Sequence, residues 1–200
     1  MTRKTCALAL VAAVFMLNTA AVRAEDPPKM TPEQEAAMKA WTEFATPGPE
    51  HQQLKHFVGN WDAAVKMWME PGAPVQESTA TSTGEMIFGD RYLLMKHEGM
   101  FEGEPFHGMA ITGFNNMTKK FNSLWIDSEG TGFYLTTGTC DKDHKVCTDT
   151  GTMDDPVSKT EMAVRQVTTH VSDTKITMEM YQTPAGGKEY KTMEITYTKK

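Results

Sequence analysis

The chain has 200 residues, of which 40% are hydrophobic and 23% charged, and its formal net charge is −6. The first 24 residues carry three basic and no acidic side chains, so the remainder has 17 basic against 26 acidic groups and a net charge of −9. Such a surface repels phosphate backbones, which argues against nucleic acid as a partner. The remaining length is typical of one domain.

Residues 1–24 have the features of a cleavable secretory signal peptide. Arg3 and Lys4 form a positive start, residues 6–21 form an apolar run, and residues 22–24 offer small side chains for cleavage. The run is shorter than a membrane span of ~20 residues and contains polar interruptions. We therefore expect a periplasmic or secreted protein whose mature form has no membrane span.

Two cysteines, Cys140 and Cys147, remain after removal of the signal. If Asp143 and His144 form the tip of a hairpin, the cysteines face each other across two strands at a Cα separation of ~4.5–5.5 Å, which a disulfide can bridge. An exported protein meets an oxidising compartment, so we predict a disulfide. Closing a loop of eight residues contributes about 2.5 kcal/mol in the chain-entropy treatment.

Metal binding is the alternative use of the same segment. Cys140, His144 and Cys147 would give zinc three ligands, but no fourth ligand lies nearby and the disulfide is favoured. A calcium loop is excluded, because Lys145 and Val146 stand where a ligand and the invariant glycine belong. Methionine-rich strands suit monovalent copper, yet they equally suit an apolar interior. We predict no metal and no resident cofactor.

Residues 25–58 have a helical and polar pattern. Thr31 caps a helix that begins at Pro32, and Gln34 completes a capping box. A Pro-Gly-Pro segment ends this helix, and a second short helix is expected over residues 50–57. The first helix has an apolar stripe, which must dock on some surface; it consists of Met38, Trp41 and Phe44.

From residue 59 to 200 the pattern is that of short strands joined by tight turns. In the first strand Trp61, Val65 and Met67 alternate with polar side chains, as on a half-buried sheet. No helix-length segment interrupts the strands, which excludes parallel crossovers. The ten predicted strands span residues 60–70, 76–88, 91–101, 104–115, 119–128, 131–140, 146–153, 160–171, 174–182 and 187–199.

Ten consecutive antiparallel strands either expose two edges or close on themselves. Closure removes the edges, so we predict an all-β, up-and-down β-barrel with a short helical segment before it; a two-sheet sandwich is the alternative. Side chains just fill a barrel of eight strands, so ten strands leave room for a ligand.

Several motifs resemble known barrel families. Gly59-Asn60-Trp61, at the start of the first strand, resembles the G-x-W signature of lipocalin-like barrels. Longer stretches, from about residue 49 to the C-terminus, resemble the bacterial family called domain of unknown function 1579. This resemblance implies a calycin-like barrel and brings no established activity. The stretches are Lys66–Pro74, Gly103–Phe106, Trp125–Ser128 with Gly130–Gly132, and Gly187–Tyr190 with Met193–Lys199.

Polar side chains within apolar strands are candidate ligand contacts, because an inward charge must be paired or used. His97 shares a strand face with Leu93 and Met95, so an inward imidazole is expected. Arg165 and Asp127 also share faces with apolar residues, and we hypothesise that the two meet at the barrel interior or mouth. The predicted ligand-binding set is Trp61, Met67, His97, Trp125, Asp127, Arg165 and Met178.

The sequence contains no nucleophile elbow and indicates no catalytic residue. A binding protein for a small, mostly apolar molecule is therefore the first interpretation. The second is an enzyme that uses Asp127 or His97 as acid or base in the same cavity, which requires a shifted pKa there. The third is an envelope interaction or stress protein with a filled barrel and an exposed apolar patch. The sequence specifies neither the ligand nor the oligomeric state.

Overall fold

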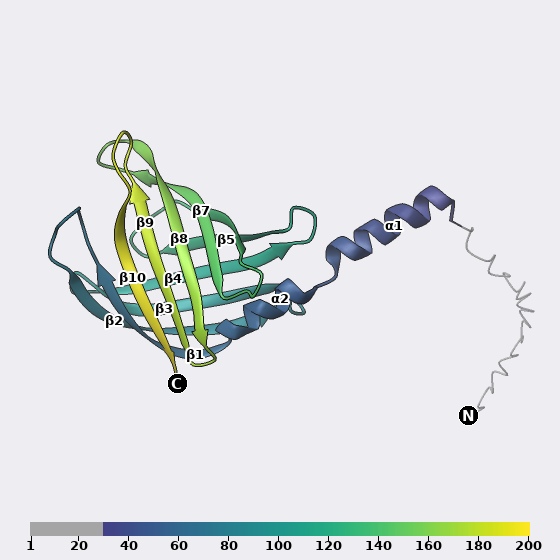
Figure 1. Cartoon of the computed structure of the whole chain (residues 1–200), viewed down its shortest axis with the longest axis horizontal. Coiled ribbons are helices and arrows are strands. Elements are labelled where there is room, and N and C mark those ends of the chain that lie inside the picture. Colours follow the sequence, from purple (N-terminus) through teal and green to yellow (C-terminus); the bar gives the residue numbers. More distant parts are fainter. Residues whose placement is uncertain (1–29) are drawn as a thin grey trace, which may run out of the picture.

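A computed structural model describes residues 30–200, so the expected signal peptide, residues 1–24, lies outside the described residues. Figure 1 shows a β-barrel with a helical arm that leads away from one side. Among the described residues, no helix has both the length and the hydropathy needed to cross a membrane. The helical elements are α1 (Pro32–Ala45), α2 (Pro49–Gln53) and the 3-10 helix η1 (Leu54–Phe57).

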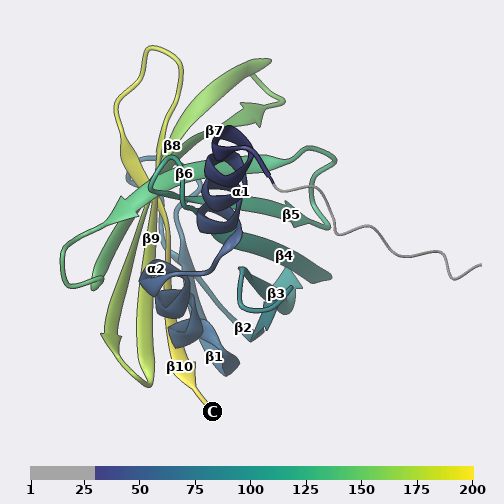
Figure 2. The same cartoon turned by 90° about the vertical axis from the view of Figure 1, so that its right-hand side faces the viewer.

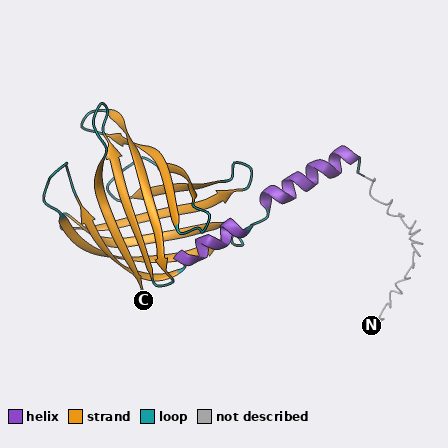
Figure 3. Ribbon diagram, viewed as in Figure 1, coloured by secondary structure: helices purple, strands orange, loops and turns teal. Residues whose placement is uncertain are grey.

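Ten antiparallel strands form a closed barrel, as Figure 3 shows in orange. Each strand pairs with the next along the chain, and β1 pairs with β10, which places Trp61 opposite Lys199. The predicted up-and-down barrel is confirmed, and the sandwich alternative is wrong. The strands are β1 (Gly59–Met67), β2 (Gln76–Ile87), β3 (Tyr92–Phe101), β4 (Glu104–Asn115), β5 (Lys120–Asp127), β6 (Tyr134–Cys140), β7 (Val146–Asp155), β8 (Thr160–Ser172), β9 (Lys175–Thr183) and β10 (Tyr190–Lys199).

Three strands differ from the prediction by three residues at one limit, all at the same end of the barrel. β1 ends at Met67, β6 begins at Tyr134, and β10 begins at Tyr190, each three residues inside the expected limit. Between β5 and β6, Asp127 Oδ1 accepts backbone N–H bonds of 3.0 and 3.1 Å from the following turn, which draws that segment out of the ladder. The residues lost from the strands therefore lengthen the loops at the barrel mouth.

The barrel end at which β1 begins is closed by α2 and η1. Leu54 of η1 is buried, and Trp61 donates its indole N–H to the Phe57 carbonyl oxygen at 2.9 Å. A side chain at Gly84 would collide with that same carbonyl group, so this glycine lets η1 lie against β2. The predicted second helix is thus present as α2 and η1. The buried apolar cluster at this closed end consists of Leu54, Trp61, Leu93, Met95, Phe121 and Ile176.

The α1 helix forms as predicted but does not dock. Thr31 and Gln34 make both hydrogen bonds of the capping box. Figure 2, seen from the side of the arm, shows α1 and α2 in front of the strands. None of the α1 residues is buried, and the side chain of Trp41 is 70% exposed. Within the described residues the apolar stripe packs against nothing, and the side-chain amide of Asn116 donates to three carbonyl groups at the end of the helix.

Candidate functional site

The barrel encloses a cavity of about 930 Å³ that extends from the core cluster toward the loops opposite η1. Both β-strand side chains and loop residues line it, including Thr131 and Gly132 of the β5–β6 loop and Pro156 of the β7–β8 turn. Loops at the mouth connect β1 to β2, β3 to β4, β5 to β6, β7 to β8 and β9 to β10. The interior of the ten-stranded barrel is therefore incompletely filled by its own side chains.

The wall of this cavity is mostly apolar and rich in sulfur. Met67 and Met178, both predicted as ligand contacts, line it. Methionine side chains are flexible and polarisable, so they adapt to ligands of irregular shape. The other lining methionines are Met69, Met95, Met100, Met153, Met180 and Met193.

His97 is the predicted site residue that lies deepest in the cavity wall. Its Nδ1 is hydrogen-bonded to Ser82 Oγ at 2.7 Å, and its ring lies 5.2 Å from the Trp125 ring and 6.2 Å from the Tyr197 ring. Burial lowers the pKa of His97 to about 4, because the charged imidazolium would lose its hydration there. His97 is thus a neutral imidazole at neutral pH, as an inward position predicts.

Trp125 and Asp127 lie near the mouth and are hydrogen-bonded to each other. The indole N–H of Trp125 donates to Asp127 Oδ2 at 2.6 Å, while Oδ1 of the same carboxylate accepts from the β5–β6 turn. A side chain at Gly108 would collide with the Trp125 ring, so glycine at this position lets the indole lie against β4. Both predicted residues line the cavity, but Asp127 is occupied with fixing the indole and the turn.

The hypothesis that Arg165 meets Asp127 is wrong. Arg165 instead makes two hydrogen bonds with Glu189, at 2.9 and 2.6 Å, and its guanidinium lies 4.0 Å from the centre of the Tyr181 ring. Its neighbour Val164 is the inward residue of this strand segment, with 2% exposure. Because strand side chains alternate, Arg165 belongs to the outer face, where an aromatic ring and a carboxylate satisfy it.

Trp61, which was predicted to contact a ligand, lies elsewhere. It lies in the core cluster of the closed end, 1% exposed, and is absent from the residues that line the cavity. The ammonium group of Lys199 lies 5.3 Å from the centre of its ring. Trp61 therefore closes the barrel floor and does not face a ligand.

An inward carboxylate that the sequence interpretation missed belongs to Asp149 on β7. Its Oδ1 lies where a side chain at Gly138 would stand, so the glycine provides the space for this acid. Burial raises the pKa of Asp149 to about 6, and burial, with a smaller effect from the Asp149 charge, raises the pKa of Tyr134. The Tyr134 hydroxyl is buried without a hydrogen-bond partner in the described structure. The sequence could have indicated an inward Asp149, because this residue shares a strand face with Cys147 and Met153.

The predicted disulfide between Cys140 and Cys147 is present. The two residues face each other across β6 and β7 at a Cα separation of 3.9 Å, shorter than expected. Both sulfur atoms are bonded to each other, so the zinc alternative with His144 loses two of its three ligands.

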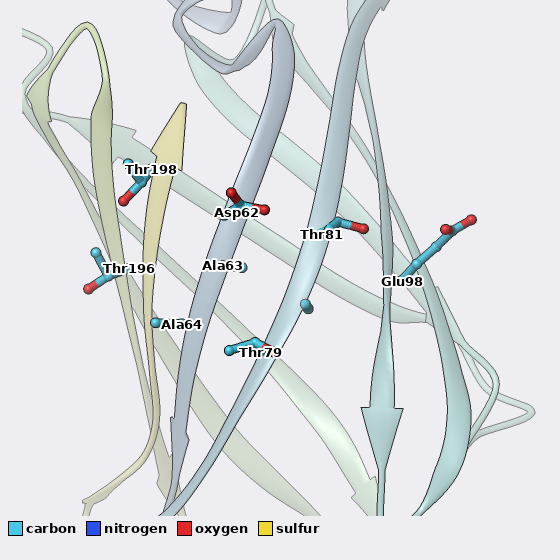
Figure 4. A pocket seen from close by; sticks show the side chains of 9 residues that line it. Asp62, Ala63, Ala64, Thr79, Thr81, Glu98, Thr196 and Thr198 are labelled. Carbon is cyan, nitrogen blue, oxygen red and sulfur yellow. The ribbon is translucent and has the colours of Figure 1, made fainter. Parts of the chain in front are cut away.

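A second, smaller hollow of about 420 Å³ lies on the outer face of the strands around β1. Figure 4 shows its threonine, alanine and carboxylate side chains on neighbouring strands. Asp62 in this groove forms an ion pair of 2.9 Å with Lys200, on a side chain that is 66% exposed. The groove exists because small side chains cover this part of the wall.

Comparison with known families bears on these features. A model of the family described as "Protein of unknown function (DUF1579)" matches residues 46–199. The chain belongs to the DUF1579 family. The match confirms the resemblance that the motifs indicated, and it includes α2, η1 and all ten strands but not α1.

No curated protein matches this DUF1579 chain. Among solved structures, Rv2717c from M. tuberculosis is similar, with 11% sequence identity and a TM-score of 0.55 over 78% of this chain and 99% of that chain. At this identity the likeness shows the fold alone. A redesigned beta barrel, 16% identical over 74% of this chain and 95% of its own, has a TM-score of 0.38, which is too low to carry an argument.

Proposed function

We propose that this DUF1579 protein is an exported binding protein that holds one small, mostly apolar molecule inside its barrel. The observation that carries the proposal is the lumen of about 930 Å³, lined mainly by apolar side chains. Small-molecule sites commonly have volumes of roughly 300–1,000 Å³, with a few polar groups among apolar ones. A protein that needed only a stable barrel would gain by filling this space.

His97 is the group that would orient the ligand. Ser82 occupies Nδ1, so Nε2 is the ring nitrogen left for a ligand, and Trp125 and Tyr197 lie beside the ring. A neutral imidazole accepts or donates one hydrogen bond without the desolvation cost of a charge. The preferred ligand is therefore an apolar molecule with one uncharged polar group at its inner end.

Export is the second part of the proposal. The first 24 residues have the pattern of a signal peptide, and the Cys140–Cys147 disulfide is of a kind that persists in oxidising compartments. N-terminal sequencing of the protein from its own host should start at Glu25. A mature protein that begins at Met1 would contradict export by cleavage.

The binding proposal is tested with a matched pair of substitutions. Ala80 lines the lumen and pairs with Ala63 and Gly99 on the neighbouring strands, so the ring of Ala80→Phe has room to extend inward. Ala64→Phe makes the same change on the outer face. Native mass spectrometry should find a retained molecule in the wild type and in Ala64→Phe, and the loss of that molecule in Ala80→Phe.

An added probe makes the test independent of what the host supplies. Anilinonaphthalene sulfonate should bind the wild type and Ala64→Phe in a saturable one-to-one complex, and Ala80→Phe should bind it at least tenfold more weakly. Equal affinity in all three proteins would show that the dye binds elsewhere, for instance on the exposed stripe of α1, and would refute the lumen as the site.

An enzyme is the second candidate, because His97 and Asp149 both have shifted pKa values in the barrel wall. The Ser82–His97 pair has the spacing of a nucleophile with its base. Ser82, however, is only 2% exposed, so a substrate cannot reach its hydroxyl and the residue positions the imidazole instead. The third interpretation, an envelope interaction or stress protein, predicted a filled barrel and an exposed apolar patch; the lumen argues against the first feature, while the exposed stripe of α1 agrees with the second.

A further inference from the structure

Two histidines and one aspartate meet at the closed end of the barrel, away from the lumen. His56 belongs to η1, His170 to the last part of β8, and Asp173 to the turn between β8 and β9. One ligand atom from each lies within 4.8 Å of the others. The two imidazole rings have centroids 4.1 Å apart at an interplanar angle of 34°. Three donors of metal-ligand type are thus gathered from segments more than a hundred positions apart in the chain.

The hydrogen bonding of these groups is incomplete. His170 Nε2 is buried and has no hydrogen-bond partner in the described structure, and Asp173 Oδ1, at 3.9 Å, is beyond hydrogen-bonding distance. His56 Nε2 lies 3.2 Å from Gln53 Oε1, which restrains that ring. A buried nitrogen without a partner requires an explanation, and an ion is one of the few that satisfy it.

The chemistry of the set identifies the class of ion. Imidazole nitrogen and carboxylate oxygen together suit zinc, copper and nickel, whereas calcium and magnesium prefer oxygen alone. Tetrahedral bonds of ~2.0–2.1 Å place neighbouring ligand atoms about 3.4 Å apart. The Asp173 side chain is 94% exposed and free to rotate, so it supplies most of the adjustment.

The charges around the cluster set the strength of the site. Asp173 places a negative charge 3.9 Å from His170 Nε2, and Lys199 is a basic group close enough to His56 to oppose a cation.

We propose that His56, His170 and Asp173 bind one divalent transition-metal ion of the zinc class at the closed end of the barrel. The ion ties η1, which covers the barrel floor, to the β8–β9 hairpin. The three protein ligands leave the fourth position of a tetrahedral ion to water. None of the three lines the lumen, so the ion would connect the floor to the wall without touching the cavity. This site is separate from the proposed ligand cavity, so either proposal stands without the other.

Zinc itself is the probe, added to the purified protein without a polyhistidine tag. Isothermal titration calorimetry should show one saturable site in the wild type. His170→Gln removes a ligand and should weaken binding by more than the 10- to 100-fold that loss of a supporting residue typically causes. Asp173→Asn, which changes a side chain that is 94% exposed, should weaken it at least tenfold. His107→Gln, at an exposed position on β4, is the matched control and should bind as the wild type does.

Thermal unfolding gives a second readout. Zinc should raise the melting temperature of the wild type and of His107→Gln, because a ligand of the folded state stabilises it, and at the same zinc concentration it should raise that of Asp173→Asn by clearly less. Absence of saturable binding, or binding that Asp173→Asn and His170→Gln leave intact, would overturn the proposal.

Discussion

Replacing Asp149 by Asn should stabilise the protein at neutral pH and not at acidic pH. Burial raises the pKa of this carboxyl from 3.8 to about 6. Between these values the folded protein keeps a proton that the unfolded chain has released, so the free energy of unfolding falls as the pH rises. A shift of about two units corresponds to about 3 kcal/mol, lost in full above about pH 6.

The substitution isolates this charge because Asn resembles the protonated acid. Urea unfolding of the wild type and Asp149→Asn at pH 3.5 and pH 8, followed by tryptophan fluorescence, gives the difference in unfolding free energy at each pH. We expect the difference in unfolding free energy, variant minus wild type, to be up to about 3 kcal/mol larger at pH 8 than at pH 3.5. Any constant effect of the amide on packing cancels between the two measurements.

The control is Asp143→Asn, in the exposed turn between β6 and β7, which should show no such dependence on pH. A difference for Asp149→Asn that is the same at both pH values would refute the reasoning. It would mean that the carboxylate is hydrated when ionised, and that the space beside Gly138 is open to water.

Three further predictions concern other residues of the barrel and its helical segment. The wild type should lose stability on acidification from about pH 6.5 to about pH 4, because the unfolded chain protonates His97 in this range and the folded protein does not. His97→Gln should abolish this loss, as measured by urea unfolding across the same range. Reduction of the Cys140–Cys147 disulfide should lower the free energy of unfolding by about 2.5 kcal/mol, seen as a lower urea midpoint with dithiothreitol. Gly138→Ala should prevent folding to a stable barrel, because its methyl group collides with the backbone of β7, whereas Gly48→Ala should leave the circular dichroism spectrum and melting temperature unchanged.

The strand pattern was predictable because each strand obeys a local rule. Alternation of apolar and polar side chains identified all ten strands, and turn residues such as Gly103 marked their limits. The errors lie at the mouth, where the hydrogen bonds of Asp127 to the next turn override the strand propensity of residues 131–133. The alternation of apolar and polar residues does not indicate which side chains hydrogen-bond to nearby backbone groups.

The direction of a charged side chain was predicted less well. The apolar neighbours of Arg165 suggested an inward face, but on the outer face its guanidinium finds Glu189 and the Tyr181 ring. Asp149 was missed although it shares its strand face with Met153, because the space that it occupies is created by Gly138 on another strand. Such pairings depend on register between strands, which a single sequence does not specify residue by residue.

The stripe on α1 shows another limit of amphipathic patterns. Met38, Trp41 and Phe44 have the spacing of a docking face, and they remain exposed in the described structure. The pattern identifies which face is apolar and not what covers it.

The seam between β1 and β10 determines when the barrel can become complete. All other strand pairings among the described residues join neighbours in the chain, whereas this seam joins Trp61 to Lys199. Pairings between distant segments form slowly, because a long loop must be ordered first. Until the last strand arrives, β1 and β9 have unpaired edges that attract other strands. A chain that is cut short before β10 is therefore the species most prone to aggregate. A circular permutant, in which the end of β10 is linked to the start of β1 and new termini are opened elsewhere, tests this order of assembly.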